Sequence, residues 1–294
     1  MKTLTAACVL RAPSIVGESP DWHAEERRLY WIDIRRQLVN RFDPRTAANE
    51  QFAVDDIVTS LNFRRAGGLI LTLRKAFAFF DPSTGRLDRL SDPEPDLPGN
   101  RFNDSECDPP GRLWAGTMSE RDWDSPSGSL YRLDAALRSA RMRCDVVCSN
   151  GTGWSPDGRT MYHTESFRYA VFAYDFDGAT GEIVNRRPFI QLDPAGGEFP
   201  DGLTVDAEGC VWSAHVGKGR IVRYDPDGGA ERQIQLPVTR GTSCTFGGDD
   251  LRTLYITSAR ETLTAAMLRR EPLAGSLFAC EAGVAGRPTH RFGG

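Results

Sequence analysis

Three oxygen-bearing side chains stand at predicted strand ends, or in the turns before them, far apart along this chain of 294 residues. Glu18 lies in Gly-Glu-Ser-Pro, Asn150 in Ser-Asn-Gly and Asp201 in Pro-Asp-Gly. Two carboxylates and one amide oxygen form a hard ligand set, which suits Ca²⁺, Mg²⁺, Mn²⁺ or Fe²⁺ and also admits Zn²⁺. A carboxylate such as Asp201 can also take a proton from water. The chemistry to test is therefore metal-assisted attack by water.

Each of these motifs also has a plainer interpretation. Asn-Gly and Asp-Gly are common turn dipeptides, and Glu18 could be an ordinary surface acid. The shared position ahead of several predicted core strands favours a common site. Arg101 and Asn103, in Arg-Phe-Asn-Asp, occupy that same position.

The elements that must position these residues form a repeating pattern. Short β-rich runs alternate with Asp-Pro, Asp-Gly and Gly-Gly turns, and long amphipathic helices are missing. A strand, a short gap, a second strand and a turn recur in six copies, which are 29–44, 68–82, 108–134, 154–175, 205–226 and 254–278. A spacing of roughly 40–50 residues is typical of a β-propeller with one four-stranded blade per copy.

We therefore predict an all-β fold, a six-bladed β-propeller formed by residues 1–294 as a single domain. Propellers often close by pairing a terminal strand into the blade from the other end. Thr5–Leu10 is the candidate to complete the blade built after about residue 240. A β-sandwich or a two-domain all-β protein is the alternative.

Composition excludes several classes of function. No apolar run approaches the ~20 residues of a membrane span. The apolar stretch at the start of the chain is too short for a secretory signal. A cytoplasmic location without a membrane partner is expected. The arginines are dispersed among acids, and the net charge of −4 opposes binding to phosphate backbones, so no nucleic-acid partner is predicted.

Other catalytic devices are missing from the sequence. The seven cysteines are scattered and odd in number, which indicates reduced, mostly buried thiols. None of the four histidines lies in His-Glu-x-x-His, and the chain has no Gly-x-Ser-x-Gly elbow, Walker loop or Rossmann fingerprint. What remains is the set of oxygen ligands.

A series of motifs along essentially the whole chain resembles the SMP-30/gluconolactonase/regucalcin-like family. Together and in this order they are highly specific. They are Gly17-Glu18-Ser19-Pro20, Arg101-Phe102-Asn103-Asp104, Asp108-Pro109 with Gly111-Arg112, Ala115-Gly116-Thr117-Met118, Ser149-Asn150-Gly151, Trp154-Ser155, Pro200-Asp201-Gly202, Asp206-Ala207-Glu208-Gly209, and Thr242-Ser243-Cys244 with Phe246-Gly247-Gly248.

The resemblance implies a six-bladed propeller that binds one divalent cation and hydrolyses a sugar lactone. It implies Glu18, Asn150 and Asp201 as metal ligands, and Arg101 and Asn103 as substrate contacts. From the chemistry of a carboxylate, we expect Asp201 to be also the base that acts on water.

The chain departs from the family pattern in two places. Relatives often carry two successive acids after Gly-Thr-Met-x, whereas this chain has Glu120 followed by Arg121, so the substrate contact moves to one of these two. Thr152 replaces a common aliphatic residue. Both departures put the sugar preference in doubt. The charged segment Ser119–Ser127 is either a lid or a solvated loop.

The leading hypothesis is a metal-dependent lactonase that acts on an aldonolactone such as glucono-, xylono- or arabinonolactone. It would work as a monomer or weak homo-oligomer. A calcium-binding propeller without turnover is the alternative from another class, and a phosphotriester hydrolase on the same fold is a third. Arg101 and Asn103 favour the enzyme, because a scaffold needs no substrate clamp.

Overall fold

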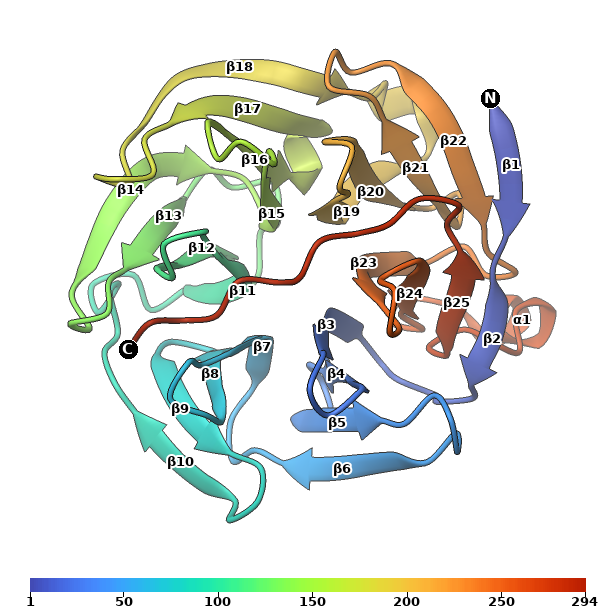
Figure 1. The fold of residues 1–294 in the computed structure, drawn as a ribbon, viewed down its shortest axis with the longest axis horizontal. Coiled ribbons are helices and arrows are strands. Elements are labelled where there is room, and N and C mark those ends of the chain that lie inside the picture. The colour runs from blue at the N-terminus through green and yellow to red at the C-terminus, as the bar shows by residue number, and fades with distance from the viewer.

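The computed structural model describes residues 1–294, and its strands form six sheets arranged as blades around one axis (Figure 1). This confirms the predicted all-β six-bladed propeller. In each blade the first strand lies nearest the axis. These inner strands are β3 (Gly17–His23), β7 (Val58–Phe63), β11 (Asn100–Cys107), β15 (Ser149–Trp154), β19 (Phe199–Val205) and β23 (Gly241–Gly247).

The remaining strands of blades 1 to 4 follow outward in chain order. They are β4 (Arg28–Asp33), β5 (Leu38–Phe42) and β6 (Asn49–Ala53); β8 (Leu69–Leu73), β9 (Phe77–Asp81) and β10 (Arg86–Arg89); β12 (Leu113–Ser119), β13 (Gly128–Leu133) and β14 (Ser139–Val146); and β16 (Thr160–Glu165), β17 (Ala170–Phe176) and β18 (Ile183–Gln191).

Blades 5 and 6 both incorporate strands from the start of the chain. Their outer strands are β20 (Val211–Val216), β21 (Arg220–Tyr224), β22 (Ala230–Gln235) and β1 (Lys2–Thr5), and β24 (Thr253–Ser258), β25 (Leu277–Glu281) and β2 (Ala7–Leu10). The short helices are η1 (Ser166–Arg168), η2 (Pro194–Gly196) and α1 (Ala265–Arg270). None of the helices has the length and hydropathy that a membrane crossing requires.

The predicted closure of the ring by the N-terminal segment is confirmed for β2, which pairs antiparallel with β25. The prediction was wrong for Thr5, which belongs to β1 and pairs in parallel with Gln235 of blade 5. The first ten residues therefore join blade 5 to blade 6, because β1 and β2 are consecutive in the chain but lie in different sheets.

The turns between strands are fixed by aspartates that also reach the core. Asp108 Oδ1 accepts hydrogen bonds from the backbone nitrogens of Gly111 and Arg112, at 2.9 and 2.8 Å. Its Oδ2 accepts from the indole nitrogen of the fully buried Trp114 at 3.0 Å. Asp206 bonds Trp212 of blade 5 in the same way, at 2.9 Å. These repeated bonds explain why Asp-x-x-Gly recurs in the sequence.

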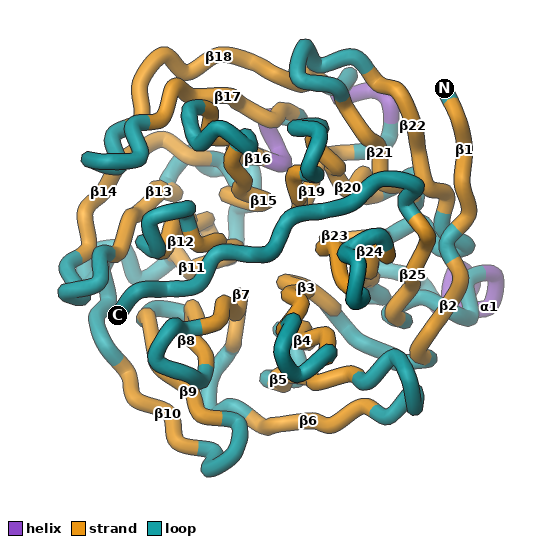
Figure 2. Tube along the Cα trace, viewed as in Figure 1, coloured by secondary structure: helices purple, strands orange, loops and turns teal.

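The last residues of the chain cross one end of the ring as an irregular strap (Figures 1 and 2). This strap contacts every blade. Its contacts are Arg291 with Glu25, Phe292 with Phe63, Gly293 with Gly111, Arg287 with the carbonyl of Trp154, Ala285 with Ala207, and Gly286 with Leu251. Phe292 is fully buried. The strap therefore holds the blades together at this end.

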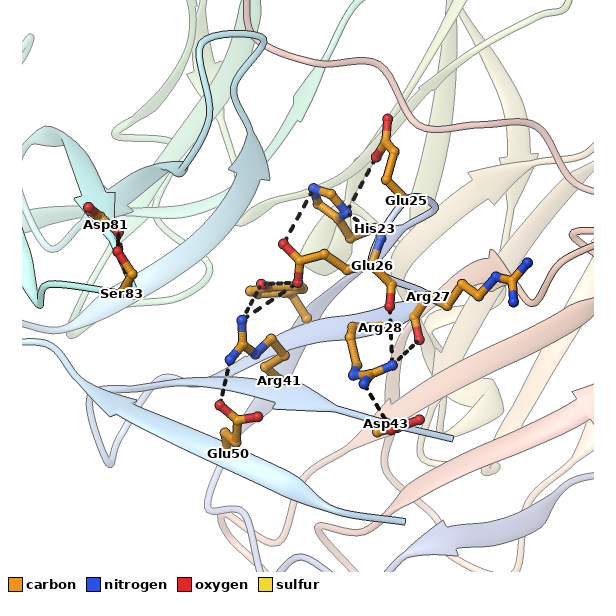
Figure 3. A network of polar contacts seen from close by, with 11 residues as sticks. His23, Glu25, Glu26, Arg27, Arg28, Arg41, Asp43, Glu50, Asp81 and Ser83 are labelled. Atoms are coloured by element: carbon orange, nitrogen blue, oxygen red, sulfur yellow. Dashed lines mark hydrogen bonds and ion pairs between the residues drawn. The ribbon is translucent and has the colours of Figure 1, made fainter. Parts of the chain in front are cut away.

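Polar contacts also link the strands of blade 1 on the side of the strap (Figure 3). Tyr30 donates a hydrogen bond from its hydroxyl to Glu26 at 2.7 Å, and Arg41 pairs with Glu50 of β6 at 2.5 Å. His23 ends β3 and accepts a hydrogen bond from the backbone nitrogen of Glu26 at 3.2 Å. The network joins the inner strand to the outermost strand of the blade.

Candidate metal centre

β-bulges place the candidate ligands. Every inner strand shifts register against its neighbour, and the shifts in β3, β15 and β19 fall at Glu18/Asp21, Ser149/Thr152 and Pro200/Leu203. A bulge bends the strand and turns a side chain away from its regular face. As a result Glu18, Asn150 and Asp201, from blades 1, 4 and 5, all line one open cavity. The structure thus brings the three predicted ligands together.

The glycines that follow two of these ligands allow the inner strands to approach closely. A Cβ on Gly151 would overlap the backbone of Leu203, and one on Gly202 would overlap Ser243. Both glycines lie inside strands rather than in turns. The turn interpretation of Asn-Gly and Asp-Gly is therefore wrong, because these dipeptides mark bulges where neighbouring blades meet.

Three acidic side chains near this cavity have few counter-charges. Burial, followed by the charges of Asp201 and Asp104, raises the pKa of Glu18 well above its usual range. Burial and then Asp104 raise the pKa of Asp201, while the Arg240 charge lowers it. Burial raises the pKa of Asp104 to about 6. Such a group of carboxylates would be stabilised in its charged form by a cation.

The oxygen atoms that a cation needs are available. Asp201 is 6% exposed, and its Oδ1 is buried without a hydrogen-bond partner. Asn150 donates its amide nitrogen to Ser166 Oγ at 3.0 Å, which orients the amide group and leaves its oxygen available. The chain has no group of three or more His, Cys, Asp or Glu side chains arranged to hold a metal ion. The candidate set therefore depends on the Asn150 amide, and its all-oxygen donors fit a hard divalent cation.

The two predicted substrate contacts lie in the same cavity. Arg101 donates from Nη1 to Asn103 Oδ1 and to the carbonyl of Phe102, both at 2.7 Å. Asn103 donates from Nδ2 to the carbonyl of Ser149 at 2.8 Å. These bonds hold both side chains in place, so the cavity presents fixed hydrogen-bonding groups beside the candidate ligands.

The structure places Glu120 and Arg121 outside the lining of this cavity. Glu120 pairs with Arg74 at 2.6 Å, and Arg121 is exposed. The segment Ser119–Ser127 connects β12 to β13, and its Trp123 does reach the cavity. A substrate contact by Glu120 or Arg121 stays a prediction from the sequence.

Several residues of the site were not predicted from the sequence. Arg35, Arg240 and Glu261 line the cavity, and Asp104 interacts electrostatically with two candidate ligands. The only sequence signal for Asp104 is its position directly after Asn103. Arg35, Arg240 and Glu261 lie in loops of blades 1 and 6, and no local motif marks them.

All seven cysteines are free, as predicted, and none forms a disulfide. Cys148 lines the cavity, and burial raises the pKa of its thiol to about 12. A thiol with so high a pKa is a poor nucleophile at neutral pH. The carboxylates are therefore the candidate reactive groups of the cavity.

Comparisons with known proteins agree with this architecture. The family model for the SMP-30/gluconolactonase/LRE-like region matches residues 16–260. The chain is 38% identical over 290 residues to 6-deoxy-6-sulfogluconolactonase from Pseudomonas putida, covering 99% of both chains. It is 36% identical over 300 residues to regucalcin from Oryctolagus cuniculus, covering 100% of both.

Among solved structures, the chain is similar to the calcium-binding protein regucalcin from Agrobacterium tumefaciens. The TM-score is 0.94 at 27% identity, over 99% of both chains. The match therefore extends over the whole propeller, including the strands that carry the candidate ligands. The chain belongs to the SMP-30/gluconolactonase/LRE-like family.

Proposed function

We propose that this protein hydrolyses a sugar lactone to the corresponding aldonic acid in a reaction that depends on one divalent cation. The observation that carries the proposal is the convergence of Glu18, Asn150 and Asp201 on one cavity, where Asp201 keeps a buried oxygen without a partner. These three residues would hold the cation. The Pseudomonas relative, named as a sulfogluconolactonase, supports this substrate class.

A bound divalent cation would polarise the lactone carbonyl and favour the negative charge that develops on its oxygen. Asp201 takes the proton from the attacking water and returns it to the ring oxygen when the acyl carbon–oxygen bond of the lactone breaks. Its position in a bulge aims the carboxylate into the cavity, and its low exposure keeps bulk water away from it. A carboxylate held beside a cation stays ionised at neutral pH, which this role requires.

Arg101 and Asn103 orient the lactone through its ring hydroxyls. Their bonds to the protein use only part of their hydrogen-bonding capacity, and both residues line the cavity. Aligning the carbonyl with the water can lower the barrier by several kcal/mol.

The alternative is binding of calcium without turnover, which the relatives named regucalcin bring into consideration. Arg101 and Asn103 favour the enzyme, because cation binding alone needs no such clamp.

Lactone opening releases acid, so a pH-drift assay tests the proposal. Glucono-, xylono- and arabinonolactone are supplied to protein stripped with EDTA and to protein reloaded with Ca²⁺, Mg²⁺, Mn²⁺, Fe²⁺ or Zn²⁺ in turn. We expect opening of at least one lactone above its spontaneous rate, loss of this rate with EDTA and recovery with one or more cations. Equal rates with stripped and loaded protein for every lactone would contradict the proposal.

A further inference from the structure

The cavity combines a cluster of aromatic rings with a pair of arginines. On the side of blades 3 to 5, which also carries Arg101 and Asn103, Trp123 stacks on Phe167 with ring centroids 5.9 Å apart, and Phe167 contacts Phe199 at 5.2 Å. On the side of blades 1 and 6, the charged residues Arg35 and Arg240 line the cavity. A substrate with one apolar face and one charged end would fit such a cavity in a single orientation.

Backbone contacts hold the two arginines on the same side. The carbonyl of Arg240 accepts a hydrogen bond from Ala259 at 3.0 Å, and Ala259 forms a β-bridge with Val16. The carbonyl of Val16 accepts from Ile34 at 2.9 Å, and Ile34 directly precedes Arg35. The two guanidinium groups therefore project from neighbouring loops that are tied to each other.

The charges on this wall do not cancel. Arg35 pairs through Nε with Glu261 at 2.6 Å, and this contact leaves the two terminal nitrogens of its guanidinium group available. Arg240 takes part in none of the ion pairs of the chain. One positive charge is thus left without a partner on a wall that faces the substrate cavity.

Arg240 lines the same cavity as the candidate ligand Asp201 but forms no ion pair with a carboxylate. An anionic group of the substrate, seated between Arg35 and Arg240, would supply the missing partner. Guanidinium groups also bind the oxygens of sulfonate and phosphate groups through paired hydrogen bonds.

We infer that the substrate is a sugar lactone that carries a tetrahedral oxyanion, a sulfonate or a phosphate, on the carbon chain away from the lactone carbonyl. Arg240 binds this group and Arg35 assists, while Trp123, Phe167 and Phe199 cover the apolar face of the sugar. This inference rests on the proposed lactonase function and adds the substrate class.

The first test measures equilibrium binding by calorimetry and does not require turnover. The probes are gluconate, 6-phosphogluconate and 6-deoxy-6-sulfogluconate, each added to Ca²⁺-loaded protein. We expect one or both of the substituted acids to bind about tenfold more tightly than gluconate, because charge-assisted hydrogen bonds are roughly twice as strong as neutral ones. The phosphate and sulfonate arms decide which oxyanion is preferred. Equal binding of all three acids overturns the inference.

The second test compares variants. Arg240→Gln should lower the preference for the substituted acids about tenfold, and Arg240→Lys should restore part of it. Arg159→Gln is the matched control, because Arg159 is exposed in the β15–β16 turn and lies outside the cavity. Circular dichroism checks that each variant is folded. An unchanged preference in folded Arg240→Gln contradicts the role of Arg240.

A kinetic experiment separates this inference from the proposed function. It compares kcat/KM for the 6-phospho or 6-sulfo lactone with kcat/KM for gluconolactone, as a ratio. Failure to open any lactone removes the proposed function, and the binding experiment then still decides on the oxyanion site. Turnover with a ratio that Arg240→Gln does not change keeps the lactonase and removes the oxyanion site.

Discussion

Buried carboxylates occupy both ends of the axial channel, but their surroundings differ. At the end where the inner strands begin, Glu18 and Asp201 face an open cavity with arginines and aromatic rings. At the other end, Asp21 of β3 and Glu106 of β11 lie beside the C-terminal strap, because Glu106 lines a second cavity with Pro288 and Thr289, and Thr289 also approaches Asp21. Neither carboxylate oxygen of Asp21 has a hydrogen-bond partner, although Thr289 is near enough to lower its pKa.

This difference shows that a buried acid alone does not define a reactive site. Burial raises the pKa at both ends, for Glu106 with a further contribution from the charge of Asp21. The open end adds the candidate amide ligand Asn150 and the hydrogen-bonded pair Arg101 and Asn103. We therefore assign chemistry to the open end and stability to the strapped end.

The largest effect is expected for Asp201→Asn. Asparagine keeps the shape of the side chain and the fold, but it cannot take a proton and is a weaker ligand. We expect kcat to fall by about 10²–10⁴-fold in the pH-drift assay, the range for loss of a general base. An unchanged kcat would remove Asp201 as the base.

A substitution at the strapped end should instead lower the stability of the protein and leave its activity unchanged. Phe292 is fully buried, and Phe292→Ala removes a large side chain from that core. The free energy of unfolding should fall by roughly 3–5 kcal/mol, the usual cost of such a cavity. Denaturant unfolding measures this change. The KM for the lactone should stay close to wild type, and a KM change without loss of stability would break the division between the two ends.

Replacing Asp21 should instead raise the free energy of unfolding, by an amount that depends on pH. Burial raises its pKa to about 7, so the folded protein binds more protons than the unfolded chain between about pH 4 and pH 7. Stability is therefore lost as the pH rises through this window. Asp21→Asn removes the penalty, and we expect the variant to be more stable than wild type by roughly 2–4 kcal/mol above pH 7 and by less near pH 4.

Unfolding curves at several pH values measure the effect of Asp21→Asn. Asp227→Asn is a suitable control, because Asp227 is exposed in a turn and should leave the pH dependence unchanged. Parallel curves for wild type and Asp21→Asn would show that Asp21 is not buried in its charged form.

The smallest expected effect is on KM, and it distinguishes two of the substrate contacts predicted from the sequence. Arg101 lines the cavity, whereas Arg121 is exposed and lies outside it. We expect Arg101→Gln to raise KM for the lactone by about tenfold, because a charge-assisted hydrogen bond is lost, and Arg121→Gln to change it by less than about threefold. A larger rise in Arg121→Gln would indicate that the segment Ser119–Ser127 closes over the substrate.

The fold was predictable because its signal is local and repeated. Aspartates such as Asp108 in blade 3 and Asp206 in blade 5 fix equivalent turns, and these turns divide the sequence into copies. The bulges were not predictable from Asn150-Gly151 or Asp201-Gly202, because the same dipeptides favour turns and only the packing of neighbouring blades decides between the two.

Other features depend wholly on tertiary structure. The strap that ends in Phe292 has no periodic pattern, and its burial follows from the complete ring. Arg35 and Arg240 line the same cavity only because the first and last blades are neighbours. The sequence could therefore predict the ligands that follow motifs but not the cationic wall beside them.

The most direct test of the central claim is a crystal structure of the protein soaked with Mn²⁺, with the ion located by its anomalous scattering. We expect one strong peak in contact with the side-chain oxygens of Glu18, Asn150 and Asp201, and loss of this peak in Asp201→Asn. A peak between Asp21 and Glu106 instead, or carboxylates at the open end that share no ion, would contradict it.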